Sequence, residues 1–181
     1  MKKTLIKCSL ITLATIASTN TLADPYVSAG FSGQNIEQVD SYNKKFSYNA
    51  NVGYAFTFIP GPVSPIVEVG LRDWGNFIQN QATVKIGPAY DAMGGLQIRV
   101  PFIGVIFAKA GAMYTTGAVD GGNKVTSYMP VAAVGLGYAF PYLSVYAEYL
   151  HAYGKTPTVT NGNLNALPSM NSGLIGVQVL L

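Results

Sequence analysis

The chain of 181 residues has few charged side chains, because only 10% of its residues are Asp, Glu, Lys or Arg. Ordinary soluble domains contain roughly a quarter, so the composition disfavours a soluble enzyme. The net charge of +3 does not indicate a basic surface, since three of the eleven basic residues are Lys2, Lys3 and Lys7 at the N-terminus. Beyond them, eight basic residues face eight acidic ones. A nucleic-acid partner is therefore excluded for lack of a basic patch.

Cysteine is almost absent as well, and the only one, Cys8, lies in a segment typical of a secretory signal peptide. Three lysines precede an apolar stretch over Leu10–Ala17, and small residues at Thr21 and Ala23 follow. The stretch has about half of the roughly 20 residues that a membrane-spanning helix needs. We therefore expect residues 1–23 to be a cleaved signal peptide and residues 24–181 to form one domain. Disulfides, thiol chemistry and cysteine-based zinc sites are then excluded from the mature chain.

The remaining chain shows a regular alternation of apolar and polar residues, which is clearest between Phe46 and Phe58. Every even-numbered residue there is apolar or aromatic, and the odd-numbered ones are Ser, Asn, Gly, Ala or Thr. This period of two is typical of a strand with one apolar face. Strands in soluble proteins average about 5 or 6 residues. The longer stretch, with aromatics at both ends, fits a tilted strand that crosses a membrane.

The same alternation recurs along the whole chain, and eight strands result. The other seven stretches are 27–32, 67–72, 84–100, 106–114, 127–140, 144–149 and 174–181. Their connections alternate between short ones (59–65, 101–104, 141–142) and longer ones (33–45, 74–81, 115–124, 154–171). Unpaired backbone groups are not tolerated in lipid, so such strands must close. The sequence thus predicts an all-β, eight-stranded antiparallel transmembrane barrel with short periplasmic turns and longer extracellular loops.

One stretch leaves a helical alternative open, because Met129–Leu143 is almost free of polar side chains. Gly135, Gly137 and Pro141 are unfavourable inside a helix, and Pro141 with Tyr142 suits the turn of a hairpin. We therefore expect two strands here.

Six charged residues fall on the lumen-facing positions of these strands. An eight-stranded barrel is just wide enough to be filled by side chains, and unpaired charges inside it would be costly. We expect an ionic network that plugs the lumen; a gated ion path through the same network is the alternative. The six residues are Glu68, Arg72, Asp91, Arg99, Lys109 and Glu148, with Glu68, Lys109 and Glu148 at the centre.

Aromatic residues near the strand ends predict girdles at the two membrane interfaces. Alternation breaks at Arg72–Trp74, where a β-bulge would swing Trp74 outward into the girdle. The expected girdle residues are Phe46, Tyr48, Phe56, Phe58, Trp74, Tyr114, Tyr128, Tyr138, Phe140 and Tyr149.

The single histidine, His151, is the only candidate for a general base. A base needs a nucleophile within hydrogen-bond reach, and Ser169 and Ser172 are the nearby serines. They do not form the adjacent H-x-S arrangement of outer-membrane deacylases. We therefore expect no catalytic residue, no metal and no cofactor, and a histidine at the barrel rim that faces lipid headgroups.

Several segments resemble a known family: 66–75 (IVEVGLRDWG), 96–102, 106–114, 134–140, 146–149 and the closing strand. Over the whole mature chain, the sequence is similar to the small eight-stranded outer-membrane barrels of the OmpA transmembrane domain, OmpX and Ail group. The resemblance implies location in the outer membrane of a Gram-negative bacterium, contact with its lipids and lipopolysaccharide, and a comparable inward ionic network. It also implies that the loops bind host surface proteins, phage or lipopolysaccharide.

In that family the last strand is read by the barrel assembly machinery and usually ends on an aromatic residue. Here the corresponding residues are Ile175, Val177, Val179 and Leu181, and the chain ends on a leucine. We expect a structural and surface-interaction barrel whose loops bind host or envelope partners. A narrow porin-like channel is the alternative, and a lipid A-modifying enzyme is a weaker one.

Overall fold

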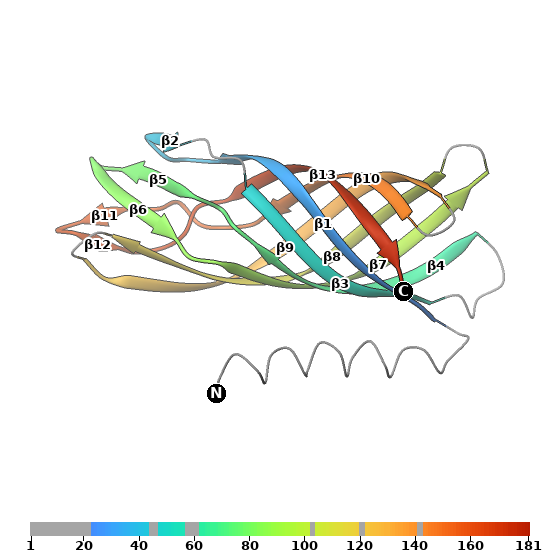
Figure 1. Cartoon of the computed structure of the whole chain (residues 1–181). Coiled ribbons are helices and arrows are strands. Elements are labelled where there is room, and N and C mark those ends of the chain that lie inside the picture. Colours follow the sequence, from blue (N-terminus) through green and yellow to red (C-terminus); the bar gives the residue numbers. More distant parts are fainter. Residues whose placement is uncertain (1–22, 44–46, 57–61, 102–103, 120–121, 141–142) are drawn as a thin grey trace, which may run out of the picture.

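The computed structural model describes residues 23–43, 47–56, 62–101, 104–119, 122–140 and 143–181. The described chain is built from strands, and none of its segments is a helix with the length and hydrophobicity to cross a membrane. Figure 1 shows the strands wound steeply around one elongated barrel. The helical alternative for residues 129–143 is wrong, because Lys124–Ala139 forms a strand.

Eight antiparallel strands close the barrel, as predicted. Each pairs with the next in the order β1, β3, β4, β7, β8, β9, β10, β13, and β13 pairs back with β1. The strands are β1 (Ala23–Ile36), β3 (Ser47–Phe56), β4 (Val63–Arg72), β7 (Ala89–Val100), β8 (Gly104–Val119), β9 (Lys124–Ala139), β10 (Leu143–Ala152) and β13 (Met170–Leu180). Closure leaves no unpaired sheet edge around the wall, which is the condition for strands to cross a membrane.

One end of the barrel carries additional strands, which we call the platform; the opposite end, where the chain finishes, is called the turn end (Figure 1). The platform consists of β2 (Ser41–Asn43), β5 (Asn76–Gln79), β6 (Ala82–Ile86), β11 (Val159–Thr160), β12 (Asn163–Leu164) and the adjoining parts of β8 and β9. β2, β5 and β6 extend the barrel sheet through the pairing of β6 with β8, and β11 and β12 form a separate hairpin.

The platform corrects the prediction that 33–45, 74–81, 115–124 and 154–171 are loops. β1 continues to Ile36 and β8 to Val119, and two hairpins occupy parts of the other segments. Both hairpins turn through two residues with positive φ, Asn80–Gln81 and Asn161–Gly162. Positive φ at both central residues is the mark of the type I′ turn, whose twist matches paired strands.

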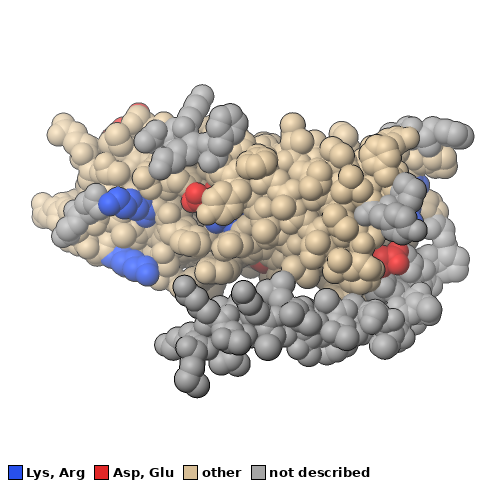
Figure 2. Space-filling model, viewed as in Figure 1, with Lys and Arg blue, Asp and Glu red and all other residues tan. Residues whose placement is uncertain are grey.

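The predicted alternation of faces is confirmed by burial. Along β3, Asn49 and Asn51 point into the lumen and are buried, whereas Tyr48 and Ala50 are exposed on the outer wall. The outward positions of the other strands are largely apolar, and most of the wall in Figure 2 carries no charged atoms. Such a surface requires an apolar surrounding along most of the barrel.

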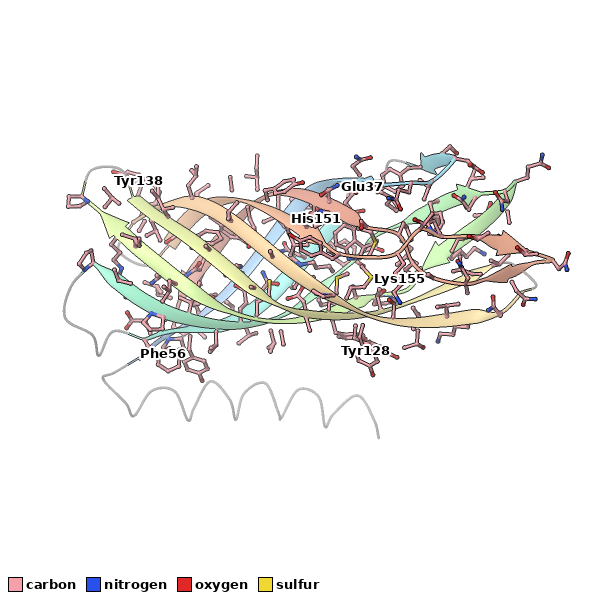
Figure 3. The ribbon with its side chains drawn as sticks, turned by 180° about the vertical axis from the view of Figure 1, so that it is seen from behind. Glu37, Phe56, Tyr128, Tyr138, His151 and Lys155 are labelled. Atoms are coloured by element: carbon pink, nitrogen blue, oxygen red, sulfur yellow. The ribbon has the colours of Figure 1, made fainter. Side chains whose placement is uncertain are left out.

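Most of the expected girdle residues that the structure describes lie on the outward face. Tyr48, Tyr114, Tyr128 and Tyr149 lie towards the platform, whereas Phe56, Tyr138 and Phe140 lie at the turn end. Figure 3 shows Phe56 and Tyr138 at the same end, with Tyr128 farther along the barrel. Tyr128 and Tyr138 are separated along β9 by about 33 Å of strand, enough to span the roughly 25 Å apolar band of a tilted barrel. Phe46 and Phe58 lie outside the described residues.

Trp74 is the exception, because it is completely buried. The chain does not bulge outward here; β4 ends at Arg72, and Gly75, at a φ of 68°, turns the chain into β5. Trp74 consequently points inward and packs with Phe77 beneath the platform. The prediction of a girdle tryptophan is wrong because a turn, and not a bulge, ends the alternation.

The outward band makes a direct prediction at Val69, which is 56% exposed midway along β4. We expect Val69→Arg to lower the free energy of unfolding in lipid vesicles by about 2–4 kcal/mol, because arginine would enter the apolar centre of the bilayer. Val69→Leu is the control and should change it by less than about 1 kcal/mol. Urea unfolding measures both variants, and equal effects would contradict the assignment of this face to lipid.

Candidate functional site: the ion-paired lumen

Five of the six predicted charged residues meet inside the barrel. Arg72 Nε lies 2.7 Å from Asp91 Oδ2, and Arg72 Nη2 lies 2.9 Å from Glu148 Oε1. Lys109 Nζ lies 2.5 Å from Glu148 Oε2 and 2.8 Å from Glu68 Oε1. All five side chains are at most 4% exposed. They form one continuous series of ion pairs in which Glu148 joins the two cations.

The position of these strands shows how far the network reaches. β4, which carries Arg72, and β10, which carries Glu148, are four strands apart in a ring of eight. They therefore stand on opposite walls, and their side chains touch across the full diameter. A barrel whose opposite walls are joined by side chains has no open passage at that level.

Tyrosine and phenylalanine rings fill the lumen between the network and the turn end. Tyr26 Oη donates a 3.0 Å hydrogen bond to Glu68 Oε2, which gives this carboxylate a second donor besides Lys109. Lys109 Nζ also lies 5.0 Å from the centre of the Phe107 ring, and that ring meets Tyr146 edge to face at 6.4 Å. The ammonium group is thus held by two carboxylates and one ring face.

Glycines make room for these rings. Tyr26, Phe107 and Tyr146 each stand directly opposite a glycine on the neighbouring strand: Gly53, Gly135 and Gly176, respectively. A Cβ atom at each glycine would collide with the ring opposite. The rings therefore lie flat over bare backbone and occupy the space that other side chains would need. The cavity that remains beside Lys109 is about 20 Å³, roughly enough for one water molecule.

An apolar core closes the platform half of the lumen. Its fully buried members include Trp74, Phe77, Met113, Met129, Leu167 and Met170, which come from barrel strands and from platform segments. The sequence analysis did not predict this core. Its signal was present in the methionines at lumen-facing positions of the fifth and sixth strands, where alternation alone predicts polar side chains.

Arg99 is not part of the network, and its predicted place was wrong. Its guanidinium lies 3.7 Å from Asp24 Oδ2 at the turn end, and the two side chains are 54% and 46% exposed. Residue parity correctly gives the face of the strand, but Arg99 is the penultimate residue of β7, where the lumen opens to solvent. The four residues expected to form the assembly signal, Ile175, Val177, Val179 and Leu181, are all exposed on the outward side of the closing strand.

Comparison with known proteins gives structural neighbours only: no protein-family model and no curated protein sequence matches the chain. The attachment invasion locus protein Ail of Yersinia pestis is 13% identical, with a TM-score of 0.59 over 89% of this chain and 100% of that one. Neisserial surface protein A is 13% identical, with a TM-score of 0.53 over 88% and 97%. The chain thus has the fold of the small eight-stranded outer-membrane barrels, as its sequence resemblance implied.

A further neighbour is a structure of Ail in complex with the heparin analogue sucrose octasulfate. It is 14% identical, with a TM-score of 0.59 over 89% of this chain and 100% of that one. At this identity the likeness concerns the fold, and the ligand belongs to Ail.

The network predicts a large effect for Lys109→Met, which removes the cation shared by Glu68 and Glu148. We expect the free energy of unfolding to fall by about 3–5 kcal/mol, because two buried carboxylates would lose their partner. Arg99→Gln is the control, since it breaks an exposed pair worth about 0–1 kcal/mol. Urea unfolding of the detergent-folded barrels measures both. Equal losses would show that the buried pairs do not stabilise the lumen.

Proposed function

We propose that this protein is a surface-interaction barrel in the outer membrane of a Gram-negative bacterium, whose sealed lumen holds a platform that binds host or envelope partners. The lumen serves as a structural plug in this proposal. Residues 1–23 act as the export signal, and residues 24–181 form the barrel domain. The outward residues of β13 are the contact for the barrel assembly machinery. Structural similarity to Ail and to a neisserial surface protein supports the location and the role.

The observation that carries the proposal is that the platform segments are bonded to one another. Asn123 Nδ2 donates to the Leu164 carbonyl oxygen at 2.9 Å, and the Leu164 amide returns a bond to Asn123 Oδ1 at 2.7 Å. This pair ties the β8–β9 connection to β12. Asn80 Nδ2 donates to the Val159 carbonyl oxygen at 2.9 Å and ties the β5–β6 turn to β11.

Two further contacts extend this linkage around the rim. Thr156 Oγ1 donates to Gln38 Oε1 at 2.9 Å, and the Asn80 amide donates to Asp40 Oδ2 at 2.5 Å. Segments from all four long connections are therefore held in one arrangement above a shared apolar core. Binding surfaces built on a rigid support lose little conformational entropy when they engage a partner.

The platform surface is polar and carries charges of both signs. Lys85, Lys124 and Lys155 are exposed there, together with Asp40, and Figure 2 shows basic side chains at this end of the molecule. The sulfated ligand of the Ail complex supports ligand binding at the corresponding end of this fold. We therefore include a sulfated glycan among the partners to be tested, alongside host surface proteins and lipopolysaccharide.

Catalysis is not part of the proposal. Among the described residues, His151 contacts Asn171 and Tyr153, and no serine hydroxyl is hydrogen-bonded to it. Ser172 points into the lumen and is buried, whereas Ser169 Oγ accepts a bond from the Gly154 amide. The base and nucleophile that a lipid A-modifying enzyme needs are therefore not brought together here.

The proposal predicts which parts of the chain are accessible from outside the cell. A short epitope inserted between Asn161 and Gly162 extends an exposed hairpin tip, so intact bacteria should be labelled by its antibody. The same epitope after Leu181 is the control and should be labelled only after the outer membrane is permeabilised. Absence of label on intact cells would contradict the proposed location and orientation.

The tagged strain also tests the surface role. Bacteria that express the protein should adhere to cultured host cells or to immobilised heparin more than an empty-vector strain, and a Fab fragment against the tip epitope should abolish the difference. Adherence that is unaffected by expression would contradict host binding by the platform.

A further inference from the structure

A groove runs across the outward wall of the barrel and passes over five strands, β7, β8, β9, β10 and β13. It encloses about 880 Å³. Its lining includes Leu96, Ala108, Val134, Tyr149 and Gly173, which are successive cross-strand neighbours from β7 to β13. Small residues at 108 and 173 make the floor, and larger apolar side chains stand beside them. This groove lies on the apolar face, outside the plugged lumen.

A polar cluster borders the groove on the side of the platform. His151 and Asn171 are the pair next to Tyr149 and Gly173 in the β10–β13 register, on the same outward face. Asn171 Oδ1 lies 2.6 Å from both Tyr149 Oη and His151 Nδ1, and Asn171 Nδ2 donates to Glu37 Oε1 at 2.6 Å. Figure 3 shows Glu37 and His151 close together where the barrel meets the platform.

The chemistry of Asn171 determines which groups face outward. The Glu37 carboxylate only accepts hydrogen bonds, so it must face the amide nitrogen of Asn171. The amide oxygen therefore receives bonds from the Tyr149 hydroxyl and from His151 Nδ1, which must carry a hydrogen. In the neutral imidazole, Nε2 is left as an acceptor.

The charge of this cluster is unbalanced. Among the residues that the structure describes, no Lys or Arg forms an ion pair with Glu37. The cluster thus presents a carboxylate and an imidazole acceptor at the end of an apolar groove. A ligand that matches both parts needs a hydrocarbon chain and a cationic hydrogen-bond donor.

We propose that the groove and the cluster together bind one membrane phospholipid with a primary ammonium headgroup, of the phosphatidylethanolamine type. An acyl chain lies in the groove over Ala108 and Gly173, and the ammonium group donates to Glu37 and to His151 Nε2. Tyr149 belongs to both parts, since its ring lines the groove and its hydroxyl belongs to the cluster. This lipid site is separate from the partner surface of the platform.

The test compares retention of phosphatidylethanolamine and phosphatidylcholine with identical acyl chains by native mass spectrometry of the detergent-folded protein. The wild type should retain phosphatidylethanolamine at least fivefold more than phosphatidylcholine, because the quaternary headgroup has no N–H donor. Glu37→Gln keeps the acceptor for Asn171 but removes the charge, so the preference should disappear. Equal retention of the two lipids by the wild type would overturn the proposal.

A second pair of variants tests the groove itself. A Cβ at Gly173 meets no neighbouring atom, so Gly173→Leu should fill the groove without strain and reduce retention of both lipids at least fivefold. Ala50→Leu, on the outward face of β3 away from the groove, is the control and should change nothing. Equal retention by Gly173→Leu and the wild type would overturn the acyl-chain site.

Two outcomes need separate readouts. Gel migration before and after boiling shows whether each variant has folded, and Ala108→Leu replaces Gly173→Leu if that variant does not fold. A dimer that forms in the wild type and is lost in the groove variants would show that a second copy of the chain occupies the groove, which would also overturn the lipid proposal.

Discussion

The contact between Arg72 and Glu148 is the interaction on which the rest of the structure depends, because it joins opposite walls of the barrel. Glu148 also accepts from Lys109, and Lys109 continues to Glu68, so the charges that the alternation places in the lumen compensate one another. Buried charges are tolerated only when they are paired and hydrogen-bonded. The ion pairs therefore let a polar inner face exist without water, and they close the passage that an open cylinder would leave.

A closed lumen moves the functional part of the molecule to its surfaces. The rings over Gly53, Gly135 and Gly176 fill the turn end, and the apolar core beneath the platform fills the other. That core also supports the linked hairpins, so one set of buried side chains both seals the barrel and orders the platform. The outward wall adds a second surface, where small residues form a groove that ends at a carboxylate. The proposed functions, partner binding and lipid binding, use these two surfaces.

Much of this arrangement was predictable from the sequence, because residue parity in a strand determines which face a side chain occupies. Parity placed Glu148 and its four partners in the lumen. It does not give depth, so Arg99 was assigned to a network that it does not reach, and it cannot distinguish a bulge from a turn, which misplaced Trp74. The Asn161–Gly162 turn has a recognisable sequence, whereas Asn80–Gln81 adopts the same geometry without one. The short platform strands depend on pairing with β8, a contact that no local pattern specifies.

The central claim, that side chains close the lumen, is tested most directly by electrical recording. Purified, folded protein is inserted into planar lipid bilayers, and the current is followed under an applied voltage. The structure predicts no reproducible conductance steps, because ion pairs join opposite walls and a second, apolar barrier lies beyond them. Steps of uniform size that appear with the folded protein, and are absent with the heat-denatured protein, would contradict the plugged lumen and favour a narrow channel.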